Sequence, residues 1–176
     1  MMAVGKSTIG RAISAATGWP YVDNDELLEK AEGRSTATVL EVEGEAALRL
    51  AESAALDFAL SLDPPVVAGV AAGVITDPDA RRRMQGDDAF VVHLRAPIEL
   101  LAERVIADEA RAAAAGRPGR PWVGDDPAAA LAELHQGRAA LYLEVADLVV
   151  DVVGRTPADM AAEIVSAVAA DRSQLG

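Results

Sequence analysis

The chain has 176 residues, of which 51% are hydrophobic and only 3% aromatic, so it can bury one core made mainly of aliphatic side chains. A formal net charge of −12 argues against non-specific binding to nucleic acid or anionic membranes, and the absence of cysteine excludes disulfides and thiolate metal sites. No apolar run reaches the ~20 residues of a membrane span and no signal peptide is evident, so we expect a cytoplasmic protein without membrane or nucleic-acid partners.

The first predicted feature is half of a phosphate-binding loop. Gly5-Lys6-Ser7-Thr8 matches the second half of the pattern Gly, any four residues, Gly-Lys-Ser/Thr. In such loops the backbone N–H groups surround phosphate oxygens, the lysine places a charge between the terminal phosphates, and the serine hydroxyl ligates Mg²⁺. A helix predicted over residues 6–17 adds its positive N-terminal end to the same anion. These four residues therefore predict binding of ATP and Mg²⁺.

The first half of this pattern is incomplete. Its first glycine would stand immediately ahead of Met1, and a buried strand normally feeds such a loop. Either the start was assigned too far downstream or the chain is truncated through its own nucleotide site. We favour the misplaced start because the remaining pattern is well formed. A chance match is disfavoured because the four residues open a predicted helix in an α/β chain.

Strands and helices alternate along the rest of the chain. Strands are predicted at residues 20–23, 66–70, 89–94 and 148–152, and further helices at 26–31, 36–41, 45–62, 78–84, 98–114, 127–145 and 157–170. This alternation predicts a three-layer α/β fold, with helices on both faces of a parallel sheet of about five strands, the first of them ahead of Met1. We expect a single domain over residues 1–176. The buried side of the 45–62 helix is predicted to carry Leu48, Ala51, Ala55, Phe58, Ala59 and Leu62.

Two carboxylates follow the strand at residues 20–23. Open α/β sheets place ligands at the carboxyl ends of their strands, where Asp23 and Asp25 stand. One carboxylate can serve Mg²⁺, directly or through water, and the other can accept a proton from a substrate hydroxyl. The alternative is that Asp25 only caps the helix beginning at Glu26.

At this point the sequence resembles the shikimate kinase family. Motifs in the right order across nearly the whole chain carry the resemblance: MMAVGKSTIGR, GWPYVDNDELLE, GEAALRLAE, VVAGVAAG, GRPW and GRAALYLEVAD. The family's Asp-x-Asp is matched by Asp23 and Asp25, and its Gly-Glu-x-x-Phe-Arg-x-x-Glu by residues 44–52, with leucine for phenylalanine. Its late Arg-x-x-x-Tyr is matched by Arg138 and Tyr142.

The resemblance implies an acceptor site. Arg49 and Arg138 would hold a substrate carboxylate, for which arginine is a planar two-pronged donor. Glu52 would orient Arg49 from the same helix face, and Asp25 would bind ring hydroxyls and accept a proton. A helical region at about 25–62 would bind the substrate, with Gly73 lying against it.

The resemblance also implies a nucleotide site. Lys6 would act on the phosphates, and Ser7 and Asp23 would serve Mg²⁺. A lid at about 107–124 would close Arg120 over the γ-phosphate, where such an arginine can raise the rate of transfer by ~10³-fold. Arg117-Pro118 competes for this role with Arg120-Pro121, which we prefer because Trp122-Val123 resembles the family's apolar pair. Adenine contacts are implied for Arg104 and Arg155.

Plainer interpretations compete with these roles. Arg49 can be a surface charge on its helix, and Arg138 a partner of Glu133 or Glu144. The two histidines of the chain, at positions 93 and 135, lie inside a predicted strand and a predicted helix and are expected to be structural.

Two departures from the family pattern bear on function. Ala3 stands where the family has glycine in the phosphate loop, a mild difference. More serious, three consecutive glycines of the family align with Ala71-Ala72-Gly73. If one of these positions needs a positive φ, an L-residue there costs roughly 1–2 kcal/mol, and a methyl group could obstruct the substrate.

The predicted function is therefore ATP-dependent phosphorylation of a hydroxyl of shikimate, a step of aromatic amino-acid synthesis, by a monomer. A degenerate relative that binds nucleotide without catalysis is the alternative from another class. A kinase for another small carboxylated alcohol is the third, because both arginines favour a carboxylate-bearing acceptor.

Overall fold

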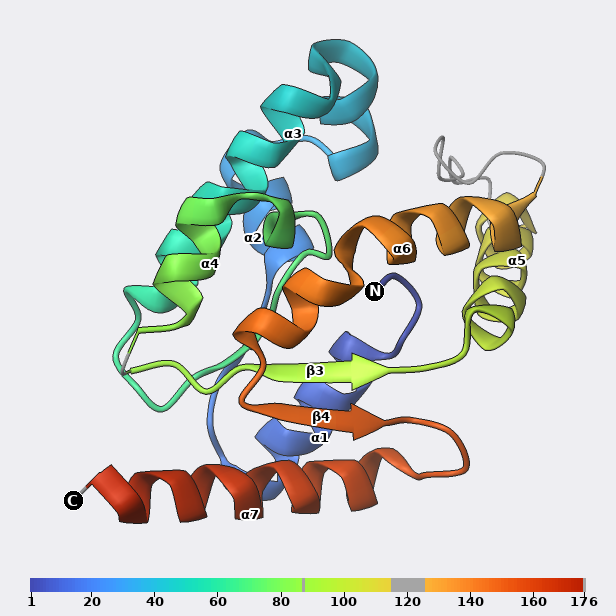
Figure 1. The fold of residues 1–176 in the computed structure, drawn as a ribbon. Coiled ribbons are helices and arrows are strands. Elements are labelled where there is room, and N and C mark those ends of the chain that lie inside the picture. Colours follow the sequence, from blue (N-terminus) through green and yellow to red (C-terminus); the bar gives the residue numbers. More distant parts are fainter. Residues whose placement is uncertain (87, 115–125, 176) are drawn as a thin grey trace.

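The computed structural model describes residues 1–86, 88–114 and 126–175 (Figure 1). Its helices are α1 (Lys6–Thr17), α2 (Asn24–Glu32), α3 (Thr36–Leu60), α4 (Pro78–Met84), α5 (Ile98–Ala114), α6 (Pro127–Val145) and α7 (Pro157–Leu175), with a 3₁₀ helix η1 (Val74–Thr76). Its strands are β1 (Tyr21–Asp23), β2 (Val67–Gly69), β3 (Val92–Arg95) and β4 (Leu148–Asp151). Within these residues no helix is long and apolar enough to cross a membrane.

The four strands form two parallel pairs. β1 pairs with β2, with Tyr21 opposite Val67, and β3 pairs with β4, with Val92 opposite Leu148. Figure 1 shows α1 behind the β3–β4 pair and α6 above the pair in this view, while α7 packs along α1. Parallel strands covered by helices confirm the predicted α/β class. The further strand ahead of Met1 stays a prediction.

An aliphatic core joins the two strand pairs. Its buried members come from the phosphate loop, α1, η1, β3, β4, α5, α6 and α7, and they include Val4, Ile9, Val74, Leu101 and Val150. A cavity of about 350 Å³ is lined by residues of both β2 and β3, together with residues of α1 and α7. β2 and β3 are not hydrogen-bonded to each other. Helix packing therefore holds the two pairs in place.

Local sequence signals set most helix ends. Gly18, at φ 76°, ends α1 where a left-handed residue is needed, and Pro78 opens α4 behind the Asp77 cap. The cap of α2 corrects the sequence interpretation, because the side chain of Asp23, not Asp25, accepts the backbone N–H at the helix start. The predicted 36–41 and 45–62 helices meet at a kink at Gly44, whose φ is 85° and ψ 177°.

The buried side of α3 differs from the predicted one. Leu48 and Ala55 are buried as expected, but Phe58 is 51% exposed, and Leu56 and Glu52 are buried instead. The apolar spacing favoured Phe58 for the buried side, and it passed over Glu52 because charged side chains are rarely buried unless they are paired. Glu52 is buried because it pairs with an arginine one turn away, as described below.

β3 and α6 meet through an aromatic stack. The rings of His93 and Tyr142 lie 5.0 Å apart between centroids with an interplanar angle of 7°. Burial, with help from nearby positive charge, lowers the pKa of His93 to about 4. His93 is therefore neutral in the folded protein at neutral pH, in keeping with the structural role expected for it.

This lowered pKa predicts a pH-dependent stability. Because the unfolded chain binds a proton at His93 below its pKa of about 6.5 and the folded protein does not, stability should fall as the pH drops from about 6.5 to 4. We expect the free energy of unfolding of the wild type to lose up to about 3 kcal/mol more than that of His93→Phe over this range.

Urea unfolding at a series of pH values measures this difference. Carboxylates titrate in both proteins, so they cancel, and the phenyl ring keeps the stack on Tyr142. Parallel pH profiles for the two proteins would contradict a buried neutral histidine.

Candidate active site

The phosphate loop leads directly into α1. Gly5 has φ 103° and forms the helix N-cap without a side-chain hydrogen bond, and the first turn contains no acidic residue. The first turn therefore supplies no carboxylate of its own, and the positive end of the helix dipole favours an anion there. Lys6 extends from the first position of the helix, and its Nζ donates to the carbonyl of Met1 at 3.1 Å.

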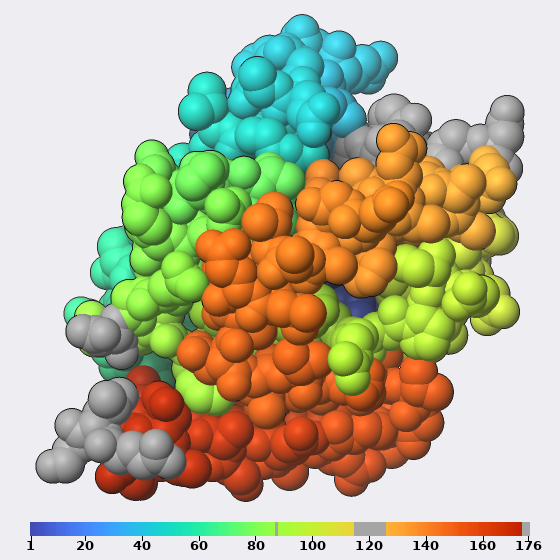
Figure 2. All heavy atoms as spheres, in the orientation of Figure 1, coloured from blue at the N-terminus to red at the C-terminus, as the bar shows by residue number. Residues whose placement is uncertain are grey.

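Arg104 on α5 is hydrogen-bonded to the backbone of this loop. Its Nη1 donates to the carbonyl oxygens of Ala3 and Val4, each at 3.2 Å. Figure 2 shows the start of the chain, in dark blue, recessed between α6 in orange and α5 in yellow-green. Sequence reasoning gave Arg104 an adenine contact, which stays a prediction, and missed its contact with the loop backbone because the two lie a hundred residues apart.

Ser7 and Asp23 lie together where α1 and β1 meet. The Ser7 hydroxyl donates to Oδ2 of Asp23 at 2.7 Å, and Oδ1 accepts the backbone N–H of Asp25 at 3.1 Å. Burial alone would raise the pKa of Asp23, but hydrogen bonds from Tyr21 and Ser7 outweigh it and hold the pKa below its ordinary value. The carboxylate is therefore ionised at neutral pH.

This pair of oxygen ligands fits Mg²⁺. In the described parts of the chain no three His, Asp or Glu side chains gather as a metal site. Mg²⁺ is normally held by one or two carboxylates together with substrate phosphates, not by a cage of protein ligands. A hydroxyl and one ionised carboxylate next to a phosphate loop meet that requirement.

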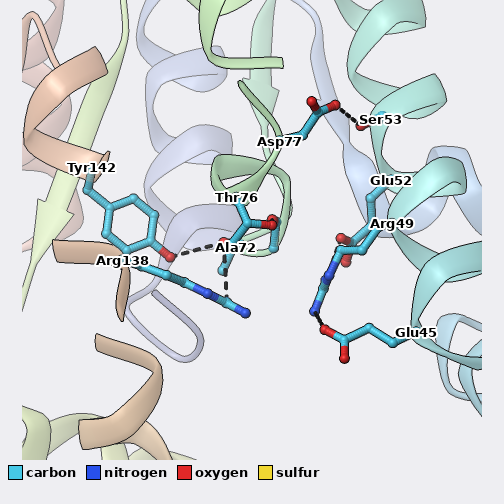
Figure 3. A network of polar contacts seen from close by, with 10 residues as sticks. Glu45, Arg49, Glu52, Ser53, Ala72, Thr76, Asp77, Arg138 and Tyr142 are labelled. Carbon is cyan, nitrogen blue, oxygen red and sulfur yellow. Dashed lines mark hydrogen bonds and ion pairs between the residues drawn. The ribbon is translucent and has the colours of Figure 1, made fainter. Parts of the chain in front are cut away.

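Arg49 on α3 is fixed by two carboxylates. Its Nη1 donates to Glu52 at 2.6 Å and its Nη2 to Glu45 at 2.9 Å (Figure 3). Burial lowers the pKa of Arg49, but the hydrogen bond and charge of Glu52 more than reverse this, so the pKa is raised. Glu52 lies on the same helix face as Arg49, as its three-residue spacing predicted, and it is buried, which the sequence did not predict.

Gly73 lies against the Arg49 guanidinium. A Cβ at residue 73 would overlap Nη1 of Arg49 and approach Glu52 Oε2 to 2.7 Å. The backbone of Gly73 has φ −77° and ψ −28°, a conformation that any residue adopts. A side chain at residue 73 would therefore have to displace Arg49 and Glu52 from the places they occupy, whereas the backbone itself would accept one.

Arg138 approaches the same segment from α6. Its Nη1 donates to the carbonyl of Ala72 at 3.5 Å, and the Tyr142 hydroxyl donates to the same oxygen at 3.0 Å. Figure 3 shows Arg138 and Arg49 on opposite sides of Ala72. Of the two carboxylates considered as partners for Arg138, Glu144 pairs with Arg81 instead. Sequence reasoning gave Tyr142 no role.

The expected strain at the degenerate glycine triplet is absent. Neither Ala71 nor Ala72 has a positive φ, so alanine costs no backbone strain at either position. A positive φ, 55°, occurs instead at Ala3, where alanine in place of the family's glycine was expected to be a mild difference. Strain of roughly 1–2 kcal/mol is therefore expected in the phosphate loop and not in the 71–73 segment.

The predicted acceptor-site groups are electrostatically close. Burial raises the pKa of Glu52, opposed by Arg49, and the charges of Asp25 and Arg138 act on the same carboxyl group. The structure thus brings Arg49, Gly73 and Arg138 together from α3, the turn after β2 and α6, and the charge of Asp25 on α2 acts on Glu52 beside them. These groups come from distant parts of the sequence.

The remaining predicted groups lie elsewhere or outside the described residues. Arg155 precedes α7 and pairs with Glu163 at 2.5 Å, and its adenine contact stays a prediction. Both Arg117 and Arg120 fall within residues 115–125, outside the described residues, as does most of the predicted 107–124 lid. Thr8 continues α1 after Ser7.

Comparison with known proteins places this geometry in a family. The family model described as shikimate kinase matches residues 2–169. The chain is 35% identical to shikimate kinase of Halorhodospira halophila over 94% of its length and 88% of that protein, and 35% identical to the Streptomyces coelicolor enzyme over 95% and 91%. It superposes on a shikimate kinase from Acinetobacter baumannii in complex with shikimate with a TM-score of 0.84 and 27% identity, covering 97% of this chain and 89% of that one.

The contact between Gly73 and Arg49 predicts an unusual cost of adding one methyl group. On backbone grounds Gly73→Ala should be neutral or stabilising. We expect it instead to lower the free energy of unfolding by about 1–3 kcal/mol, because Arg49 and Glu52 must move. In an Arg49→Ala background the loss should be smaller.

Denaturant unfolding of the four proteins measures this coupling. Gly137→Ala is the matched control: it lies in α6 with nothing within 4 Å of the added methyl, so it should stabilise. An equal effect of Gly73→Ala in both backgrounds would show that Arg49 does not impose the glycine.

Proposed function

This chain belongs to the shikimate kinase family, and we propose that it transfers the γ-phosphoryl group of ATP to a hydroxyl of shikimate, giving shikimate 3-phosphate. The observation that carries the proposal is the convergence of Arg49 and Arg138 on residues 72–73, beside a phosphate loop. Two guanidinium groups that approach one short segment can bind an anionic ligand together, and a carboxylate matches their planar donors. The A. baumannii relative is described in complex with shikimate, which carries such a group.

The acceptor is held, in this proposal, by groups already fixed by their neighbours. Arg49 and Arg138 bind the carboxylate, and Glu52 keeps the Arg49 guanidinium in place. Asp25 receives the ring hydroxyls and accepts the proton of the attacking one. Gly73 leaves room for Arg49 and lets the substrate approach the backbone. Prior orientation of the acceptor lowers the entropy cost of the transfer.

The donor is held by the phosphate loop. Backbone N–H groups at Gly5 to Thr8 and the N-terminus of α1 receive the phosphates, and Lys6 places its charge on the transferring group. Ser7 and Asp23 would hold Mg²⁺, which when bound neutralises charge on the phosphate oxygens. Arg104 stabilises the loop through its hydrogen bonds to the loop carbonyls and, in this proposal, also contacts the adenine.

Further parts of the proposal rest on the family alone. Arg120 closes over the γ-phosphate as part of the lid at about 107–124, and Arg155 contacts the adenine. The working form is a cytoplasmic monomer, organised as one domain over residues 1–176. The non-catalytic alternative loses one of its supports, because Ala71 and Ala72 have no positive φ.

Release of ADP coupled to shikimate tests the proposal. We expect shikimate-dependent turnover of Mg-ATP, and a KM for shikimate raised roughly tenfold to hundredfold by Arg138→Ala or Arg49→Lys, because each removes a charged hydrogen-bond donor or its two-pronged geometry. The KM for ATP should change little.

Arg82→Ala is the matched control, since Arg82 lies on the exposed surface of α4 and pairs only with Asp79 among the described residues. Absence of shikimate-dependent ADP release would refute the proposal. Turnover with a different carboxylated alcohol would keep the kinase and change the acceptor.

A further inference from the structure

The side chain of Tyr21 fills a slot made by two glycines. A Cβ at Gly10 in α1 would overlap the Tyr21 ring, and a Cβ at Gly69 in β2 would overlap its hydroxyl. Glycine weakens both a helix interior and a strand. At both positions the same side chain occupies the space that a methyl group would need. The Tyr21 ring is therefore held between α1 and β2, with the Arg11 guanidinium 5.5 Å from its centroid.

The hydroxyl of Tyr21 ends at the carboxylate already assigned to Mg²⁺. It donates to Asp23 Oδ2 at 2.6 Å, the same oxygen that accepts the Ser7 hydroxyl at 2.7 Å. The other oxygen, Oδ1, accepts the N–H of Asp25. Asp23 is thus oriented by three donors, and the one from Tyr21 is fixed because its ring is held between α1 and β2.

A phenyl ring would fill this slot as well as a phenol ring. The hydroxyl adds one polar contact and requires Gly69 to lack a side chain. Ser7 has a single proton, and donating it to Asp23 leaves the lone pairs of its oxygen for a cation. The orientation of the Ser7 hydroxyl therefore depends on where Asp23 Oδ2 lies, and Tyr21 fixes that oxygen.

We propose that Tyr21 is a positioning residue for the divalent cation: its hydroxyl holds Asp23, and through Asp23 the Ser7 hydroxyl, in the arrangement that receives Mg²⁺ with the nucleotide. This inference rests on the proposed function, because it takes Ser7 and Asp23 as the Mg²⁺ site. Partners that orient a ligating carboxylate typically change metal affinity by 10–100-fold when they are removed.

Calorimetric titration of the full chain with ADP, once with EDTA and once with Mg²⁺, tests this role without catalysis. The ratio of the two dissociation constants gives the factor by which Mg²⁺ tightens ADP binding. We expect Tyr21→Phe to reduce this factor roughly tenfold and to leave the ADP dissociation constant in EDTA within about twofold of the wild-type value. In an Asp23→Asn background the same substitution should leave the factor unchanged.

Tyr142→Phe is the matched control, because it removes the hydroxyl that donates to Ala72 and should not alter the Mg²⁺ factor. The proposal is overturned if Tyr21→Phe leaves the Mg²⁺ factor unchanged or makes it larger. It is also overturned if Tyr21→Phe lowers this factor equally in the wild-type and Asp23→Asn backgrounds. Weaker ADP binding in EDTA by the same amount overturns it too, since the hydroxyl would then support nucleotide binding without the cation. A wild type whose ADP binding does not respond to Mg²⁺ instead refutes the proposed nucleotide site, and this inference with it.

Discussion

The guanidinium of Arg49 occupies the space beside Gly73, and the rest of the candidate acceptor site is arranged around that contact. Glu52 is buried on α3 because it pairs with Arg49, although an unpaired carboxylate there would be costly. The turn after β2 must come close enough for its backbone to touch the guanidinium. Arg138 and Tyr142 then fix the same turn from α6 through the Ala72 carbonyl. A single close approach thus links three elements that are distant in sequence.

A second set of contacts joins the phosphate loop to the sheet. Ser7 and Tyr21 meet on Asp23, and Arg104 meets the loop carbonyls from α5. The loop is therefore held on one side by a carboxylate at a strand end and on the other by a cation on a helix. Both contacts leave the positive end of α1 directed at the space for an anion. The nucleotide half and the acceptor half of the site meet at β2. The Tyr21 hydroxyl lies against Gly69 in this strand, and Gly73, against Arg49, follows four residues later.

The sequence predicted the fold where the signals are local. The bounds of α1, α4, α5 and α6 agree with their predictions, because Gly18, Pro78 and Pro127 stand at their ends and the apolar spacing runs between them. The predictions were wrong where distant contacts decide. Asp23 instead of Asp25 caps α2, and Phe58 is exposed while Glu52 is buried. A buried ion pair is invisible to an apolar pattern.

The site shows the same division. The Arg49–Glu52 hydrogen bond could be predicted from three-residue spacing on one helix. The positions that need glycine could not be predicted in this way, because they depend on which side chain from a distant element lies next to them. Ala71 and Ala72 looked damaging and carry no positive φ, whereas Ala3 looked harmless and does. The Tyr21 slot depends on Gly10 and Gly69 together, which no local pattern connects.

The central claim is that Arg49 and Arg138 form a site for the carboxylate of a small acceptor, and its most direct test is calorimetric binding of shikimate and of its methyl ester to the full chain saturated with ADP. The ester keeps the ring and its hydroxyls and removes only the negative charge. The account predicts measurable binding of shikimate and affinity for the ester weaker by roughly a hundredfold, because two charged donors lose their partner. Equal affinity for the two compounds, or binding of neither, would contradict it.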